Sequence, residues 1–99
     1  MNEEKRVPEI AVVHWRDLEP HMLRDALLVI SESLDLYTAS EKISEDDTAT
    51  IQTWIESGQI SKPSKEQLKL WETQRKKEFR CSIVQPFVLI QELLGEPDS

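Results

Sequence analysis

The chain has 99 residues, of which 38% are hydrophobic and 31% charged, and its formal net charge is −7. This length fits one domain with a single core, and the apolar content is too high for a disordered chain. The acidic balance argues against non-specific nucleic-acid binding, which draws its affinity from clustered Lys and Arg. No apolar run approaches the roughly 20 residues that a membrane helix requires.

The cysteine content and the chain ends suggest where the protein works. Cys81 is the single cysteine, so it has no partner for an internal disulfide, and residues 1–8 lack the apolar stretch of a signal peptide. We therefore expect a cytoplasmic protein. Because both ends are polar, we predict a flexible N-terminus at residues 1–8, a single α+β domain at 9–94 and a flexible C-terminal tail at 95–99.

A short helix is predicted around the first tryptophan, because Trp15, Leu18 and Met22 share one helical face. Pro20 fits a helix interior poorly. The sequence therefore favours a helix that starts near Glu19, with the proline in its first turn.

A β-hairpin is predicted over residues 27–39. Residues 27–30 form an apolar run with β-branched members, and residues 34–39 alternate in character with the period of a half-buried strand. Two such segments so close together indicate an antiparallel pair. The turn lacks Asn-Gly or Asp-Gly, so its type stays open.

Two helices are predicted next. Ser44 is a candidate N-cap followed by three acids, and Gly58 is placed to end a helix, so we expect a helix over residues 47–57. Ser64 and Gln67 have the spacing of a capping box and open a second helix.

The last predicted element covers Phe79–Leu94, where two β-rich apolar runs flank Pro86. Proline cannot donate to a ladder, so it implies a bulge, a bend or an edge position. A strand that is apolar on both faces is usually central or covered. The predicted order is α-β-β-α-α-β: an α+β fold with a small antiparallel sheet of about three strands and helices packed on one face.

Several residues match the pattern of a known family. They are Trp15-x-x-Leu18, Leu34-Asp35-Leu36, Glu45-Asp46-Asp47, Trp54-Ile55-x-x-Gly58, Trp71 and Val84-x-Pro86-Phe87-Val88-Leu89-Ile90-Gln91-Glu92. Over about residues 12–93 the chain resembles a bacterial family of short proteins, domain of unknown function 2288. It departs from the family at Phe87, where tryptophan is common, and at Glu32-Ser33, where proline and glycine are common. The resemblance implies a bacterial, cytoplasmic protein and lends no catalytic residue, because the family has no assigned activity.

Several residues are candidates for metal binding or catalysis, and each also has a structural explanation. The acids Glu41, Glu45, Asp46 and Asp47 are a candidate cation site, but their spacing is not that of an EF-hand, and we favour helix capping. His14 and His21 lack partners that complete a zinc pattern, so we favour surface or capping roles.

The remaining candidates favour the core. No base is marked for Cys81, so we expect a buried structural thiol. Trp15, Trp54 and Trp71 each fall on the apolar face of a predicted helix, which favours packing over ligand stacking. The sequence therefore predicts no catalytic residue, no cofactor and no metal.

Charge is divided unevenly along the chain. Residues 32–56 carry seven acids against one base, a sum of −6, and residues 62–80 carry seven bases against three acids, a sum of +4. The two segments could face each other within one molecule or between two, and solvated helix faces are the favoured interpretation.

Our leading hypothesis is a non-enzymatic protein-interaction domain that homodimerises. The two-sided apolar character of the last predicted strand motivates it. The candidate interface residues are Phe87, Leu89, Gln91 and Glu92. For Glu92, pairing with Arg80 or Lys77 is the favoured structural role. The alternatives are a small-ligand-binding protein or an undetected enzyme, with nucleic-acid binding through residues 62–80 less favoured; an unknown protein partner stays open and a membrane is not expected.

Overall fold

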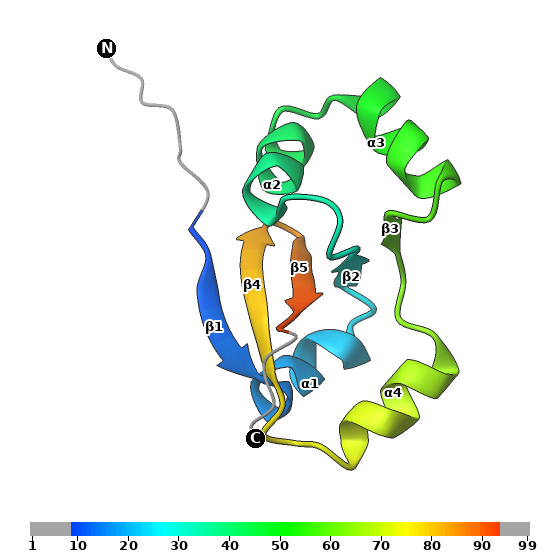
Figure 1. The fold of residues 1–99 in the computed structure, drawn as a ribbon. Coiled ribbons are helices and arrows are strands. Elements are labelled where there is room, and N and C mark those ends of the chain that lie inside the picture. The colour runs from blue at the N-terminus through cyan, green and yellow to red at the C-terminus, as the bar shows by residue number, and fades with distance from the viewer. Residues whose placement is uncertain (1–8, 94–99) are drawn as a thin grey trace.

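Nine elements follow one another in the computed structural model, which describes residues 9–93. They are β1 (Ala11–His14), α1 (Trp15–Leu23), β2 (Leu27–Ile30), α2 (Leu36–Ser44), α3 (Thr48–Glu56), β3 (Ile60–Ser61), α4 (Lys65–Glu72), β4 (Glu78–Val84) and β5 (Phe87–Glu92). The five strands form one mixed sheet in the order β1-β4-β5-β2-β3 (Figure 1). Strand β5 runs parallel to β2, and the other neighbouring pairs are antiparallel. The ends predicted to be flexible, 1–8 and 95–99, lie outside the described residues.

Helices cover both faces of this sheet. Alternate side chains of β5 belong to two separate cores, because successive residues of a strand point to opposite faces. Val88 and Ile90 pack with residues of α1 and α4, whereas Leu89 packs with residues of α2. The domain therefore has three layers, with α1 and α4 on one face and α2 and α3 on the other.

An aromatic cluster fills the core under α1 and α4. Trp15, Trp71 and Phe79 are each at most 1% exposed. Their ring centroids lie 5.2 Å apart for the two tryptophans, 5.0 Å for Trp71 and Phe79, and 6.0 Å for Trp15 and Phe79. Tilted and edge-to-face pairs at these separations are favourable beyond their buried area. The core role predicted for Trp15 and Trp71 is confirmed, and Trp54 is only partly buried, at the margin of the second core.

The predicted order α-β-β-α-α-β is wrong, as is the small antiparallel sheet of about three strands with helices on one face; the α+β class is confirmed. The described residues contain five strands and four helices, and the helices lie on both faces. Strand β3 was missed because two residues are too few to show a period, and β1 was missed although residues 10–13 form an apolar run like that of β2. The apolar segment predicted as one strand is the β4–β5 hairpin, which turns at the cis Gln85-Pro86 bond.

The predicted hairpin over residues 27–39 is also wrong in its second half. Strand β2 is present, but residues 36–39 open helix α2. Asp35 caps this helix, because its carboxylate accepts from the backbone N–H and the hydroxyl of Thr38, both at 2.9 Å. Leu36 and Ala39 are both buried and lie three residues apart, on one face of this helix. The apparent alternation of residues 34–39 concealed this helical spacing.

Helix α1 begins at Trp15 rather than near Glu19, so Pro20 lies inside it. A proline at this position removes one backbone bond, to the carbonyl of Arg16, which is an exposed residue. The helix over 47–57 is confirmed as α3, but Asp47 rather than Ser44 caps it, accepting from the N–H of Thr50 at 3.3 Å.

The predictions at the other helix ends are confirmed. Ser64 and Gln67 form the expected capping box at the start of α4, with bonds of 2.9 and 3.0 Å. Gly58 has a φ of +82° just after α3, the left-handed conformation in which glycine commonly ends a helix.

Candidate functional site

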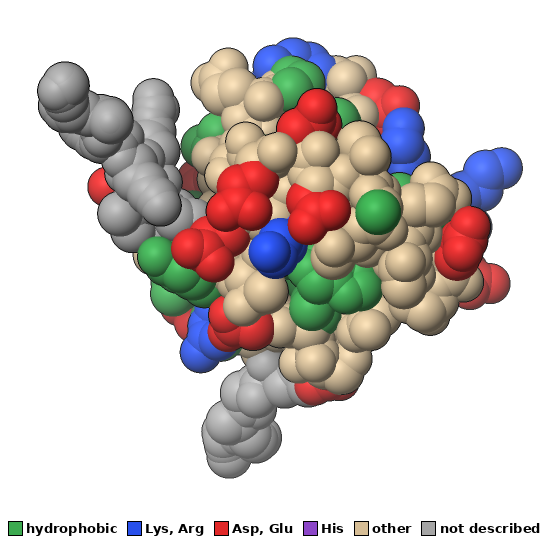
Figure 2. Space-filling view, turned by 90° about the horizontal axis from the view of Figure 1, so that it is seen from above, with side chains coloured by type: hydrophobic (Ala, Val, Ile, Leu, Met, Phe, Trp, Pro, Cys, Tyr) green, Lys and Arg blue, Asp and Glu red, His purple; other side chains and the backbone are tan. Residues whose placement is uncertain are grey.

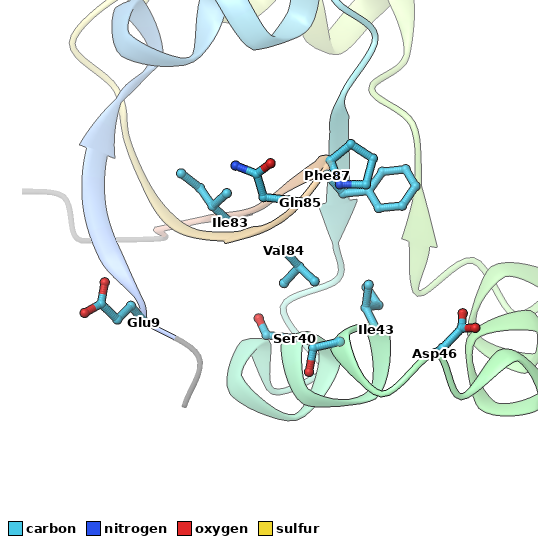
Figure 3. A pocket seen from close by; sticks show the side chains of 10 residues that line it. Glu9, Ser40, Ile43, Asp46, Ile83, Val84, Gln85 and Phe87 are labelled. Atoms are coloured by element: carbon cyan, nitrogen blue, oxygen red, sulfur yellow. The ribbon is translucent and has the colours of Figure 1, made fainter. Parts of the chain in front are cut away.

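A groove of about 870 Å³ lies between the tip of the β4–β5 hairpin and helix α2 (Figure 3). Glu9 and Asp46 lie on opposite sides of it in this view. Between them the groove is lined by side chains of the hairpin and of α2, namely Ile83, Val84, Gln85, Pro86, Phe87, Ser40, Ile43 and Ser44. We call this feature the hairpin groove; it combines an apolar floor with an acid on each side.

The serine hydroxyls of the hairpin groove are already engaged. The Ser40 hydroxyl donates to the carbonyl of Leu36 at 2.9 Å, and the Ser44 hydroxyl donates to the carbonyl of Glu41 at 3.0 Å. No His, Cys or Lys occurs among the described residues that line the groove. The lining therefore supplies apolar contact and negative charge, and it lacks the nucleophile–base pair that covalent catalysis uses.

Acidic side chains gather at the end of the molecule formed by α2 and α3 (Figure 2). Lys42 is the single base between residues 32 and 56, and it lies 3.8 Å from Glu45 and 3.9 Å from Asp47. Within residues 9–93, no three His, Cys, Asp or Glu side chains converge as a metal site requires. The capping role favoured for these acids is confirmed for Asp47, which caps α3.

Strand β1 forms an edge of the sheet and pairs only with β4 among the described strands. The N–H of Trp15 donates to the carbonyl of Lys77 at 2.9 Å, which extends the β1–β4 register by one pair. Bonded and non-bonded pairs alternate along an antiparallel ladder. Ala11 and Val13 therefore bond to β4, and Val12 directs its N–H and C=O away from the sheet. We call this side of β1 the open edge.

The neighbouring ladder gives the same result independently. The N–H of Leu93 donates to the carbonyl of Glu78 at 3.4 Å, so Glu78 and then Arg80 direct their backbone groups toward β5. Phe79 and Cys81 must then direct theirs toward β1, where they face Val13 and Ala11. The side chains beside the open edge are apolar: Ile10 is 40% exposed and Val12 57%.

The structure does not bring the four predicted interface residues to one surface. Phe87 is 39% exposed and lines the hairpin groove, whereas Leu89 and Gln91 are 0% and 6% exposed. The Gln91 amide donates to the carbonyls of Ser31 and Leu34, at 2.8 and 2.7 Å. Glu92 pairs with Lys77 at 3.3 Å, one of the two partners expected for it.

The candidate catalytic groups are dispersed. Cys81 is buried in β4, and burial raises the pKa of its thiol. His14 precedes α1, and its ring nitrogens lie 3.8 Å from carboxylate oxygens of Asp17 and Glu78. His21 lies in the last turn of α1, where its Nδ1 is 2.6 Å from Arg24 Nη2. None of the three lines the hairpin groove.

The basic segment pairs with acids outside the acidic segment. Arg75 lies 2.9 Å from Glu19, Lys77 pairs with Glu92, and Lys62 lies 2.6 Å from Asp25. None of these acids falls within residues 32–56. Among the described residues, the two charged segments therefore form no ion pair with each other, and the acidic end is left almost without counter-charge.

Comparison with known proteins identifies the family. The chain matches the family model described as "Protein of unknown function (DUF2288)" over residues 3–92. The chain belongs to this family. The resemblance seen in the sequence over residues 12–93 is therefore confirmed, and the match extends before β1 into the N-terminal residues.

A solved structure shares the DUF2288 chain's fold. The NMR solution structure of PA1075 from Pseudomonas aeruginosa superposes with a TM-score of 0.78 and 31% sequence identity, covering 92% of this chain and 83% of that one. Among curated proteins, none matches. In the described part of the DUF2288 chain, no helix is both long and apolar enough to cross a membrane.

The open edge and the hairpin groove were both missed from the sequence. Strand β1 was missed although residues 10–13 form an apolar run like that of β2, and the groove unites Glu9 with segments more than 30 residues away along the chain. The available signal was the β-branched pair Val12-Val13 just before the first helix.

Proposed function

We propose that this DUF2288 chain is a cytoplasmic, non-enzymatic protein-interaction domain that forms a homodimer. The observation that carries the proposal is the pair of exposed apolar side chains beside the open edge, Ile10 and Val12, with further exposed apolar residues at the nearby hairpin tip. Eight large hydrophobic residues are exposed among those described, and four of them lie on or beside β1 or at the hairpin tip: Ile10, Val12, Ile83 and Phe87. Clustered exposed apolar residues mark interaction sites, whereas scattered ones need no explanation.

The chemistry of the hairpin groove supports interaction over catalysis. Its serine hydroxyls donate to backbone carbonyls, and His14, His21 and Cys81 lie elsewhere. Cys81 is also buried with a raised pKa, which opposes formation of the nucleophilic thiolate.

The test is the mass of the protein in solution. Sedimentation equilibrium between micromolar and millimolar concentrations should show a species of twice the 11.5 kDa chain mass, in equilibrium with the monomer. Because obligate monomers do not change mass with concentration, an 11.5 kDa species across the whole range would refute the homodimer.

A second candidate is ligand binding in the hairpin groove. Its volume of about 870 Å³ falls within the roughly 300–1,000 Å³ of small-molecule sites. Its apolar floor between Glu9 and Asp46 suits a ligand that carries an apolar body and a positive charge.

A titration followed by amide chemical shifts tests this candidate. The probes are a pair of hexyl derivatives, hexyltrimethylammonium and neutral hexanol. The groove hypothesis predicts shifts confined to α2 and the hairpin tip, larger for the cation, and reduced by Asp46→Asn. Shifts of equal size for both probes, or shifts spread over the domain, would contradict it.

A further inference from the structure

We propose that the partner at the open edge is a second copy of this chain, added antiparallel so that the two β1 strands join two sheets into one. Each five-stranded sheet would then continue into its partner across a two-fold axis. The proposal rests on the homodimer proposed above and specifies its geometry, which the mass of the dimer alone leaves open.

The backbone of the open edge fits such an addition. Val12 directs its N–H and C=O outward, and the same alternation, continued one residue before β1, would direct those of Ile10 outward as well. The N–H of His14 also faces outward, but it donates to the carboxylate of Asp17 at 3.2 Å. In the proposed register, Ile10 of each copy faces Val12 of the other, and the two residues exchange backbone hydrogen bonds. This pair occurs twice in the dimer, and Ala11 lies on the two-fold axis between the two pairs.

The two edges of the sheet differ in how well they are protected. Edge strands that avoid pairing are short or carry lysine, proline or a bulge. At one edge, β3 has two residues and is followed directly by Lys62-Pro63. At the other, β1 has four residues, and Ile10-Ala11-Val12-Val13 contains no lysine or proline, although Pro8 lies two residues before Ile10 in the sequence. Pairing with another strand is therefore better blocked at the β3 edge than at the β1 edge.

Side chains favour the same register. Ile10 and Val12 lie on the same face of β1, opposite the aromatic cluster, and both are more than a third exposed. In the proposed pair each isoleucine faces the valine of the other copy. Directly opposed β-branched side chains stabilise antiparallel strands, and here two such pairs flank the axis.

Charge selects the antiparallel orientation. Glu9 lies just before the N-terminal end of β1, and Asp46 lies across the hairpin groove from it. Arg16 follows its C-terminal end, and its N–H donates to the carbonyl of Arg75, which places Lys76 in the adjacent loop. These charged side chains form no ion pair with another described residue: Glu9, Asp46, Arg16 and Lys76. An antiparallel pair sets Glu9 of each copy toward the end of the other copy's β1 at which Arg16 and Lys76 lie.

The decisive variant is Val12→Pro, with Val12→Thr as its matched control. Proline removes the outward N–H and spares the bonds to β4, because those come from Ala11 and Val13. Two hydrogen bonds are lost per dimer, so the dimer dissociation constant should rise roughly 5- to 150-fold. Threonine keeps the backbone donor and the β-branch, so it should change the constant by less than about fivefold.

A charge swap supplies a second test that leaves the backbone intact. Glu9→Lys should weaken the dimer roughly two- to fivefold, and adding Arg16→Glu should restore it, because the two positions then attract again with reversed signs. Glu66→Lys, on the exposed surface of α4, makes the same charge change away from the edge and should have no effect.

The outcomes separate the two proposals. A monomeric wild-type chain refutes the homodimer itself. A wild-type dimer whose dissociation constant is unchanged by Val12→Pro, with the circular dichroism of the folded chain preserved, refutes only the β1 pairing. If Val12→Pro does not fold, hydrogen exchange on the wild type decides: protection of the Val12 amide must increase with protein concentration, and concentration-independent exchange overturns the pairing.

Discussion

Gln91 provides the sharpest test of the fold, because its side chain holds together two segments distant in sequence. Its amide lies on the α2 side of β5, 6% exposed, and donates to the carbonyls of Ser31 and Leu34. These carbonyls belong to the connection between β2 and α2, which the sequence predicted to be a hairpin. We expect Gln91→Leu to keep the side-chain volume and to lose both bonds.

The magnitude follows from those two bonds. A buried hydrogen bond contributes about 0.5–1.5 kcal/mol net, so two contribute about 1–3 kcal/mol. The leucine recovers part of this by burying apolar surface, so we expect the free energy of unfolding to fall by about 2 kcal/mol. For a domain of this size that lowers the melting temperature by roughly 8–16 °C.

Urea unfolding followed by far-ultraviolet circular dichroism measures the change. Gln74→Leu makes the same substitution at an exposed position and should lie within about 0.5 kcal/mol of wild type. If Gln91→Leu behaves like this control, the amide does not hold the β2–α2 connection. The structural role assigned to it here would then be wrong, and Gln91 would return as an interaction residue.

Four further predictions concern single side chains. Trp71→Ala should lower the free energy of unfolding by roughly 3–5 kcal/mol, read from the urea midpoint, because it empties the centre of the aromatic cluster. Gly58→Ala should cost about 1 kcal/mol because its φ is +82°, although a Cβ there meets no atom within 4 Å; Ser57→Ala is the neighbouring control. Ser82→Ala should be neutral or stabilising in the same assay, because the buried Ser82 hydroxyl lacks a hydrogen-bond partner among the described residues; a loss above about 1 kcal/mol would reveal one. Burial raises the pKa of the Cys81 thiol, so the contribution of the neutral thiol to stability is present below the ordinary thiol pKa, near 8.5, and is lost as the pH rises above it. Cys81→Ala should remove that part of the fall in the free energy of unfolding at alkaline pH.

Helix ends were predictable from the sequence where a side chain caps the backbone locally. The capping box of Ser64 and Gln67 and the terminating Gly58 appear where the sequence predicted them. Asp35 and Thr38 form an equally local cap, but the alternation of residues 34–39 favours a strand and conceals it. A period-2 pattern over six residues is weak evidence for a strand, because the first two turns of an amphipathic helix can produce the same pattern.

Sheet order was not predictable, because it depends on pairings between distant segments. The parallel contact of β2 with β5 joins residues about 60 apart in the chain, and no local pattern encodes it. The candidate surfaces share this limit. The hairpin groove is assembled from the β1 end, α2 and the β4–β5 tip, so its acids and apolar residues gain a common role only in three dimensions.

The apolar run that suggested an interface has a different explanation in the fold. Val88, Leu89 and Ile90 are at most 2% exposed because β5 lies between β4 and β2 and helices cover both faces. A two-sided apolar strand therefore indicates a central position, and the surface available to a partner must lie where the layers end. That place is β1, whose aromatic-side face is packed and whose outer edge pairs with no other described strand; residues 10–13 contain no lysine or proline. In the proposed pairing of β1 strands, the contact residue is Val12, which the sequence did not single out, whereas Leu89 is buried.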